Sequence, residues 1–168
     1  ALAMGVTTEE MAAWRDAADA AHIPFDEELG VHPQCEGFTT LREWNFVDNT
    51  VYPLLMHEPY VRVYPAQVIK QADLVLAMHW QGHAFTAEQK ARNVDYYERR
   101  TTRDSSLSAC TQAVMCADVG HLELAHDYTY EAAMIDLRDL HRNTRDGLHM
   151  ASLAGGVDRA GGRIRWPS

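Results

Sequence analysis

Residues 65–81 read PAQVIKQADLVLAMHWQ and form the most apolar helical pattern in the chain. Apolar side chains recur there three or four residues apart, the spacing that places them on one face of a helix. Pro65 suits the first turn of a helix, where a backbone N–H has no helical partner to lose. The pattern predicts a helix from Pro65 to about Gln81. The positions that carry it are Val68, Ala72, Val75, Leu76 and His79.

Further helical patterns lie on both sides of this stretch. Two of them begin with a threonine followed three residues later by Glu or Gln, the spacing of a capping box. Residues 23–50 break the period with proline and glycine and predict a long structured loop, and no segment has a convincing strand pattern, so the fold class is all-α. The predicted helices and their capping residues are 8–21 (Thr7 and Glu10), 86–97 (Thr86 and Gln89), 107–119 (Ser105 or Ser106) and 121–133, followed by a helical start at Leu148.

The chain has 168 residues, with 24 acidic and 15 basic side chains and a formal charge of −9. This length is ordinary for one domain. A negatively charged surface does not attract nucleic-acid phosphates or anionic lipids, so the composition argues against both partners. The apolar runs are too short to span a bilayer, and no basic segment followed by an apolar core opens the sequence. We therefore expect neither membrane insertion nor export, and a cytoplasmic location.

The cysteines and histidines do not predict a metal site. Cys35, Cys110 and Cys116 form no CxxC pair, which predicts reduced thiols that pack as small apolar side chains. The nine histidines show neither HxH nor HExxH spacing. The sequence also has no glycine-rich phosphate loop and no GxSxG motif.

Three loops concentrate polar side chains. Residues 26–34 suit either a solvated acidic turn or the binding of a sugar, a cation or another loop. Residues 96–108 carry three arginines and five serines or threonines ahead of a helix start. Free backbone N–H groups and the helix dipole favour an anion such as phosphate there, and the alternative is N-capping with arginines in surface ion pairs. In residues 143–149, His149 can donate to an anion or satisfy a neighbouring carbonyl.

Several of these segments together resemble glycoside hydrolase family 65, which includes inverting phosphorylases of maltose, trehalose and kojibiose and some hydrolases. The resemblance covers about residues 5–155 and implies an (α/α)6 toroid, in which helices and their loops surround a sugar pocket. Because the family is several times longer, we expect this chain to supply only the C-terminal part of the catalytic domain. The resembling segments are Tyr52–Leu55, Lys70–Met78, Asn93–Glu98, Asp104–Ser108 and Asp146–His149.

The resemblance implies roles for five residues. Lys70 and Gln71 correspond to residues that hold the glucosyl unit, and Ser105, Ser106 and His149 correspond to the phosphate pocket. The implied reaction is inversion, in which phosphate attacks the anomeric carbon of an α-linked glucose disaccharide and yields β-glucose 1-phosphate. Inorganic phosphate is the co-substrate and no cofactor is expected. Full-length relatives are expected to be homo-oligomers.

The resemblance assigns no catalytic residue to this chain. The family's general acid, a glutamate in a Gly-x-Asp-Glu-Tyr segment, lies upstream of the region that residues 5–21 resemble, so we expect no turnover by the chain alone. Many phosphorylases of the family carry a hydroxyl residue two places after the histidine that His149 matches, where this chain has Ala151 followed by Ser152. Hydrolysis is therefore the alternative, with Glu98 or Asp104 as the base that activates water. A third alternative is an inactive helical remnant.

Residues 156–168 depart from the apolar helix that the resemblance implies after Gly155. One choice of synonymous codons for residues 156–167, read from the second base, encodes Ala-Trp-Thr-Ala-Leu-Val-Ala-Gly-Phe-Gly-Gly. We therefore interpret the tail as the product of a frameshift, and the alternative is a divergent C-terminus. A coding sequence that does not restore the helix in the shifted frame would contradict this interpretation. The glycines and arginines of the tail offer little apolar surface, so we expect it to be disordered.

Overall fold

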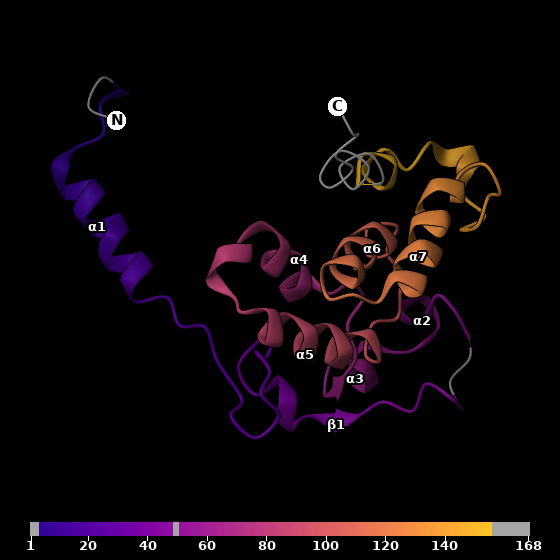
Figure 1. The fold of residues 1–168 in the computed structure, drawn as a ribbon, viewed down its shortest axis with the longest axis horizontal. Coiled ribbons are helices and arrows are strands. Elements are labelled where there is room, and N and C mark those ends of the chain that lie inside the picture. The colour runs from indigo at the N-terminus through magenta and orange to yellow at the C-terminus, as the bar shows by residue number, and fades with distance from the viewer. Residues whose placement is uncertain (1–3, 49–50, 156–168) are drawn as a thin grey trace.

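The computed structural model describes residues 4–48 and 51–155 (Figure 1). Helices dominate, and the two strands have two residues each, which confirms the all-α class. No helix among the described residues is long and apolar enough to cross a membrane. The predictions for residues 156–168 lie outside the described part.

The α-helices are α1 (Thr8–Asp19), α2 (Leu54–His57), α3 (Tyr60–Val63), α4 (Asp73–Trp80), α5 (Ala87–Glu98), α6 (Ser108–Asp118) and α7 (Leu122–Met134). The 3₁₀ helices are η2 (Phe38–Thr40), η3 (Gly82–Ala84) and η4 (Thr144–Asp146). A further helical segment covers 150–155.

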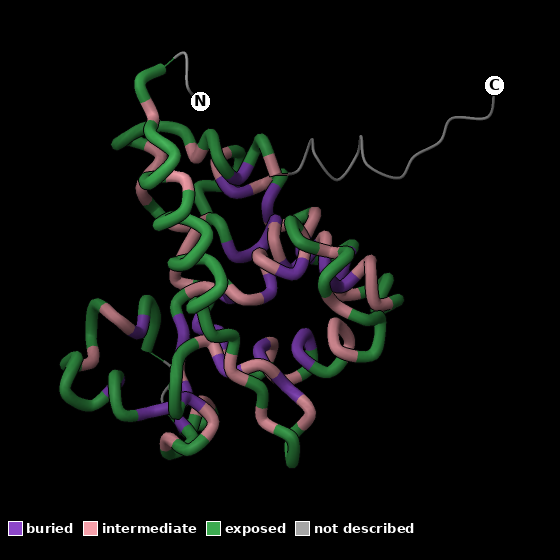
Figure 2. Tube along the Cα trace, turned by 90° about the vertical axis from the view of Figure 1, so that its left-hand side faces the viewer, coloured by how far each residue is buried: buried purple, intermediate pink, exposed green. Residues whose placement is uncertain are grey.

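The core lies where α4, α5, α6 and α7 pack together (Figures 1 and 2). Gly120 separates α6 from α7 with a φ of 91°, a left-handed conformation that glycine adopts without strain. The capping box predicted at Thr86 and Gln89 is present at the start of α5. Burial of apolar side chains from all four helices is the main force that holds them together. The buried set includes Val75, Met78, Val94, Tyr97, Met115, Cys116, Ala125 and Tyr128.

The helix predicted over residues 65–81 is wrong in its first half. Ala66–Gln67 is a strand, β2, which pairs in parallel with β1 (Arg42–Glu43). The helix, α4, begins only at Asp73. The apolar spacing of this stretch fits both structures, because residues buried on two sides of a short strand also form a continuous apolar run. The pair of strands β1 and β2 also shows that the prediction of no strands is wrong.

The side chain of Gln67 explains why this segment stays extended. It is buried, and its Nε2 donates to the carbonyls of Thr39 and Leu41 at 3.0 and 2.7 Å. Its Oε1 accepts hydrogen bonds from Tyr96 Oη and Arg100 Nε, both at 2.6 Å. A buried amide with all these partners fixes the backbone that carries it, because breaking the network would leave several polar groups unpaired.

A second, smaller apolar cluster joins β2 to two helices that the sequence patterns did not predict. It consists of Trp44, Leu54, Val63 and Ala66, all buried. α2 and α3 have four residues each and follow Pro53 and Pro59, which take extended conformations at the N-caps. Four residues are too few to show helical periodicity, so local sequence gives no signal for them.

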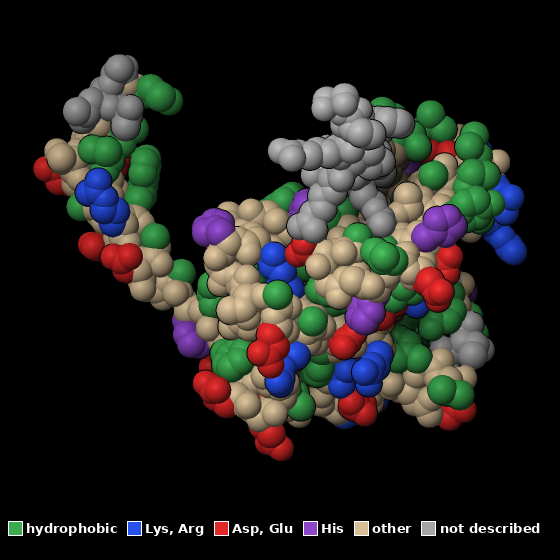
Figure 3. All heavy atoms as spheres, viewed as in Figure 1, with side chains coloured by type: hydrophobic (Ala, Val, Ile, Leu, Met, Phe, Trp, Pro, Cys, Tyr) green, Lys and Arg blue, Asp and Glu red, His purple; other side chains and the backbone are tan. Residues whose placement is uncertain are grey.

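The first helix is confirmed, but it stands apart from the rest of the protein (Figure 1). Its capping box between Thr7 and Glu10 is present in both directions. None of its residues is buried, and Trp14 is 59% exposed. Hydrophobic side chains lie uncovered along the helix (Figure 3). The sequence pattern therefore predicted the helix correctly, while the apolar face that the pattern implied has no partner among the described residues.

The cysteine prediction is correct for two of the three residues. None of the three cysteines forms a disulfide with another described residue, and Cys110 and Cys116 are buried in the core. Cys35 is exposed, contrary to the prediction, because it lies in the irregular loop before η2 rather than on a packed helix. Burial raises the pKa of the Cys110 thiol above its usual value, which favours the unreactive protonated form.

The acidic loop at residues 26–34 forms a turn that packs on α5. Asp26 accepts hydrogen bonds from the backbone N–H groups of Leu29 and Glu28 at 2.9 and 3.1 Å. His32 N donates to the Asn93 side chain at 2.9 Å, and its carbonyl accepts a hydrogen bond from Tyr97 Oη at 2.6 Å. Of the alternatives for this loop, the contacts support a structural turn.

Asp26 makes the stability of the fold depend on pH. The Leu29 N–H, the Thr39 hydroxyl and the Glu28 N–H hold the pKa of Asp26 below its ordinary value. The unfolded chain therefore binds this proton more readily, so the stabilisation is present above about pH 4 and is lost as the pH falls through the lowered pKa.

We expect Asp26→Asn to unfold at a lower urea concentration than wild type at pH 6. The difference between the two midpoints should shrink in acid. Asp16→Asn, on exposed α1, should leave the profile unchanged; an Asp26→Asn deficit independent of pH would contradict the assignment.

Candidate functional site

The candidate site forms where the segment before α4 runs beside the loop before α6. Ile69 N donates to the carbonyl of Arg100 at 2.9 Å, and Thr102 N donates to the carbonyl of Ile69 at 2.8 Å. These two bonds form an isolated parallel bridge between Ile69 and Thr101. The bridge sets the register, so that the residues following it on each segment reach the start of α6 together.

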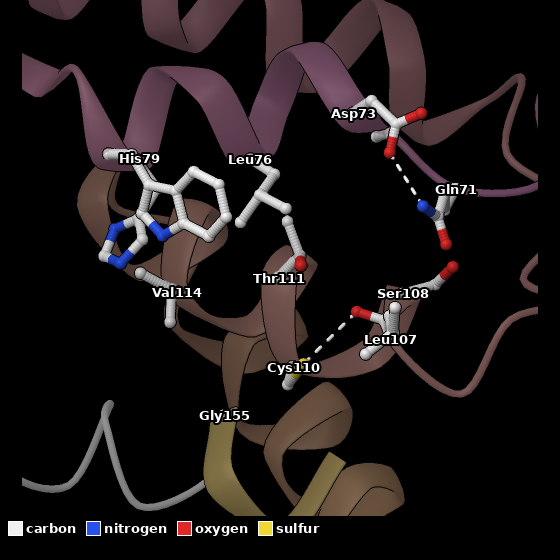
Figure 4. A pocket seen from close by; sticks show the side chains of 12 residues that line it. Gln71, Asp73, Leu76, His79, Leu107, Ser108, Cys110, Thr111, Val114 and Gly155 are labelled. Carbon is white, nitrogen blue, oxygen red and sulfur yellow. Dashed lines mark hydrogen bonds between the residues drawn. The ribbon is translucent and has the colours of Figure 1, made fainter. Parts of the chain in front are cut away.

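Gln71 and Ser105 are in direct contact at this point. Ser105 Oγ donates to Gln71 Oε1 at 2.8 Å, and Gln71 Nε2 donates to Asp73 Oδ1 at 2.8 Å. Figure 4 shows the Gln71 amide lying between Asp73 on one side and the α6 start on the other. Gln71 therefore has a fixed orientation before any ligand arrives. The sequence patterns did not predict the contact with Asp73, although Asp73 is only two residues from Gln71.

Lys70 and Ser106 flank this contact. The Lys70 carbonyl accepts a hydrogen bond from Ser108 Oγ at 3.3 Å, while the Lys70 side chain is exposed. Ser106 is half-buried in the loop. The prediction that Ser105 or Ser106 caps the helix is wrong: α6 begins after Leu107, without a side-chain cap. Ser105 Oγ instead accepts a weak bond from Leu107 N at 3.3 Å, because its hydroxyl hydrogen is directed to Gln71.

A cavity of about 280 Å³ opens beside Gln71 (Figure 4). It lies between α4 and α6, and most of its surface is apolar. The polar groups at one end come from Gln71, Asp73 and Ser108. A volume of this order accommodates a small ligand, and a few polar groups at one end of an apolar cavity are typical of ligand sites.

His149 is not in contact with the other predicted site residues. It lies before the helical segment 150–155, and no hydrogen bond among the described residues joins it to Ser105 or Ser106. Its ring Nδ1 is 2.6 Å from Asp136 Oδ1, and its backbone N–H donates to Asp136 Oδ2 at 2.9 Å. The structure thus brings Lys70, Gln71 and Ser105 together and leaves His149 on a neighbouring segment.

Glu98 has partners on both of its carboxylate oxygens. Tyr128 Oη donates to Oε1, and Gln112 Nε2 donates to Oε2 at 2.6 Å. Arg103 lies 3.7 Å from Oε1. Burial and the Glu98 carboxylate raise the pKa of Tyr128, so the phenol keeps its proton and remains a donor. The second candidate base, Asp104, accepts a hydrogen bond from Leu55 N at 3.1 Å and anchors α2.

The described residues contain no group of three or more His, Cys, Asp or Glu side chains placed to hold a metal ion. The candidate site offers amide, hydroxyl and lysine side chains as hydrogen-bonding groups. These are groups that bind sugar hydroxyls and anions.

Residues 1–158 match the model of the glycosyl hydrolase family 65 central catalytic domain. The chain belongs to this family. Its mostly helical structure is consistent with part of the helical toroid that the resemblance implied.

Some relatives are described as glycosyl hydrolases and others as phosphorylases. A Mycobacterium tuberculosis protein described as an uncharacterised glycosyl hydrolase is 88% identical over 153 residues, which are 91% of this chain and 20% of that protein. An α,α-trehalose phosphorylase of Geobacillus stearothermophilus is 42% identical over 158 residues, 89% of this chain and 20% of the relative. A solved structure described as a kojibiose phosphorylase from the human microbiome superposes with a TM-score of 0.81 at 29% identity, over 93% of this chain and 21% of that one. The chain thus spans about a fifth of the length of these relatives.

Proposed function

We propose that this chain is the part of an inverting α-glucoside phosphorylase that holds the glucosyl unit and the attacking phosphate. The whole enzyme would cleave a glucose disaccharide with inorganic phosphate and release β-glucose 1-phosphate in the cytoplasm. Family membership and the phosphorylases among the relatives support an enzyme of this class. Lys70 and Gln71 would bind the sugar, and Ser105, Ser106 and His149 the phosphate, with no cofactor.

The hydrogen bond between Ser105 and Gln71, at 2.8 Å, is the observation that carries this proposal. In phosphorolysis with inversion, phosphate must approach the anomeric carbon of the sugar from the face opposite the leaving group. A residue that binds the sugar and a residue that binds the phosphate must therefore lie within about the width of one sugar ring of each other. The direct contact between Gln71 and Ser105, which are 34 positions apart, supports these two roles.

The chain's own groups would bind and orient, while proton transfer to the leaving oxygen comes from the acid expected elsewhere in the domain. Gln71 can donate to one sugar hydroxyl and accept from another, since an amide has both capacities. Lys70 supplies a cation beside it. Orientation of this kind lowers the barrier because the reactants meet in the reactive geometry.

Hydrolysis is less well supported by the site. A base that activates water needs a free carboxylate oxygen facing the sugar. Both oxygens of Glu98 accept hydrogen bonds from side chains, and Asp104 accepts one from the backbone of α2. These contacts favour a structural role for Glu98, and they tie Asp104 to α2 through one of its two oxygens.

A chimera tests the proposal. In it, residues 1–155 of this chain replace the matching segment of the M. tuberculosis relative, which restores a complete domain. We expect β-glucose 1-phosphate from maltose, trehalose or kojibiose only when phosphate is present, with the unmodified relative as control. Release of glucose without phosphate would indicate the hydrolase instead. An inactive chimera beside an active relative would indicate a remnant.

A further inference from the structure

The carboxylate of Asp136 holds both the ring and the backbone of His149. Asp136 follows α7 directly after Ile135, and its oxygens lie 2.6 Å from His149 Nδ1 and 2.9 Å from His149 N. The two side chains are largely enclosed, with exposed fractions of 8% and 16%. Two bonds to one residue fix both the position of the ring and its rotation.

This arrangement decides which ring nitrogen carries hydrogen. The hydrogen bond from His149 holds the pKa of Asp136 below its ordinary value, so the carboxylate is ionised at neutral pH. An ionised carboxylate only accepts hydrogen bonds, so Nδ1 must be the protonated nitrogen. Nε2 is then the nitrogen left for another partner. Among the described residues, Asn143 Nδ2 lies 3.4 Å from Nε2, a distance at the limit of a hydrogen bond.

We propose that Asp136 is the positioning residue of the phosphate subsite and fixes His149 with hydrogen on Nδ1, so that Nε2 binds the phosphate. The inference rests on the function proposed above. When Nε2 is protonated it donates to a phosphate oxygen, and when it is unprotonated it accepts from a P–OH group. Asn143 Nδ2 lies beside Nε2, close enough for both nitrogens to reach one phosphate oxygen. Asn143 Oδ1 is buried and accepts no hydrogen bond from the described residues, so no protein donor fixes the amide through its oxygen.

The other groups around the ring do not replace Asp136. His141 stacks edge to face with His149, with ring centroids 5.6 Å apart. Asp139, three residues after Asp136, accepts a hydrogen bond from Thr144 N at 3.0 Å and so serves the turn at η4. Asp139 is therefore a matched control, because it is a nearby carboxylate that bonds the backbone without contacting His149.

The test is an NMR measurement of the His149 ring nitrogens in the full 168-residue chain, above the pH range where histidine titrates. We expect hydrogen on Nδ1 in wild type, Asp136→Glu and Asp139→Asn. In Asp136→Asn we expect a shift toward the Nε2–H form, which unconstrained imidazole prefers. The wild-type spectrum is informative by itself, so the inference stays open to contradiction even where a variant fails to fold. Hydrogen on Nε2 in wild type, or an unchanged ring in Asp136→Asn, would overturn the inference.

Titration of the same samples with inorganic phosphate separates this inference from the proposed function. We expect phosphate to shift the His149 ring signals of wild type, and Asp136→Asn to weaken the affinity about tenfold, the effect of one misplaced charge-assisted hydrogen bond. If Nδ1 carries the hydrogen but phosphate does not shift the His149 ring signals, the phosphate subsite is refuted. The role of Asp136 in that subsite is then refuted as well. A phosphate response with the wrong tautomer would refute the role of Asp136 alone.

Discussion

Replacement of Gln71 by alanine is expected to lower kcat/KM of the chimera for its disaccharide about 30-fold. The variant removes an amide that would bond two sugar hydroxyls, at about 1 kcal/mol for each bond, and about 2 kcal/mol corresponds to that factor. It also removes the acceptor of the Ser105 hydroxyl, so the side chain proposed to bind phosphate loses its fixed orientation. Steady-state kinetics with varied disaccharide and varied phosphate measure both effects.

Gln81→Ala is the control for this variant. Gln81 is an exposed glutamine at the end of α4, the same helix that Gln71 precedes. We expect its kinetics to match those of the parent chimera. If Gln71→Ala also matched the parent, the amide would not touch the substrate, and the assignment of this segment to the sugar subsite would be wrong.

Met115→Ala is expected to lower the free energy of unfolding of the chain by about 3 kcal/mol. Met115 lies on α6 with 0% of its surface exposed, between the helices of the core. Truncation to alanine loses the buried methylene, sulfur and methyl groups and leaves a cavity that the close-packed surroundings fill only in part. The midpoint of urea unfolding, followed by far-ultraviolet circular dichroism, measures the loss.

Met56→Ala provides the comparison of the same chemical change at the surface. Met56 lies on α2 and is 80% exposed. We expect its effect to stay within about 0.5 kcal/mol, the usual range of a surface substitution. Equal midpoints for the two variants would mean that α6 is not packed in solution as the structure has it.

Local sequence patterns predicted the longer helices well and the short elements poorly. The capping boxes at Thr7 and Thr86 mark true helix starts, because each is completed by bonds within three residues. The pattern of residues 65–72 predicts a helix, because nothing in their own order shows that Gln67 contacts Thr39, Leu41, Tyr96 and Arg100. Those partners lie about thirty residues away in either direction, and only the folded chain brings them together.

The sequence and the resemblance supplied the residues proposed for the candidate site, but they did not predict the contacts between them. The anion-binding character expected at the α6 start identified the loop with Ser105, and the resemblance supplied Gln71, yet neither predicted that the two would share a hydrogen bond. The partners of His149 and Glu98 were missed for a similar reason. Asp136, Gln112 and Tyr128 lie 13, 14 and 30 residues from the groups that they bond. Gln112 and Tyr128 are on helices whose apolar stripes predict only core packing, and Asp136 follows the end of α7.

The isolation of α1 divides the chain into parts that unfold separately. No residue of α1 is buried, so its opening breaks only its own backbone bonds and exposes no core surface. A helix of twelve residues without packing is marginal in water, even with a good cap. The next anchored residue is Pro24, whose carbonyl lies 2.9 Å from His32 Nδ1. The cooperative folding unit of the protein thus begins near Pro24, and α1 joins and leaves it without changing the stability of the core.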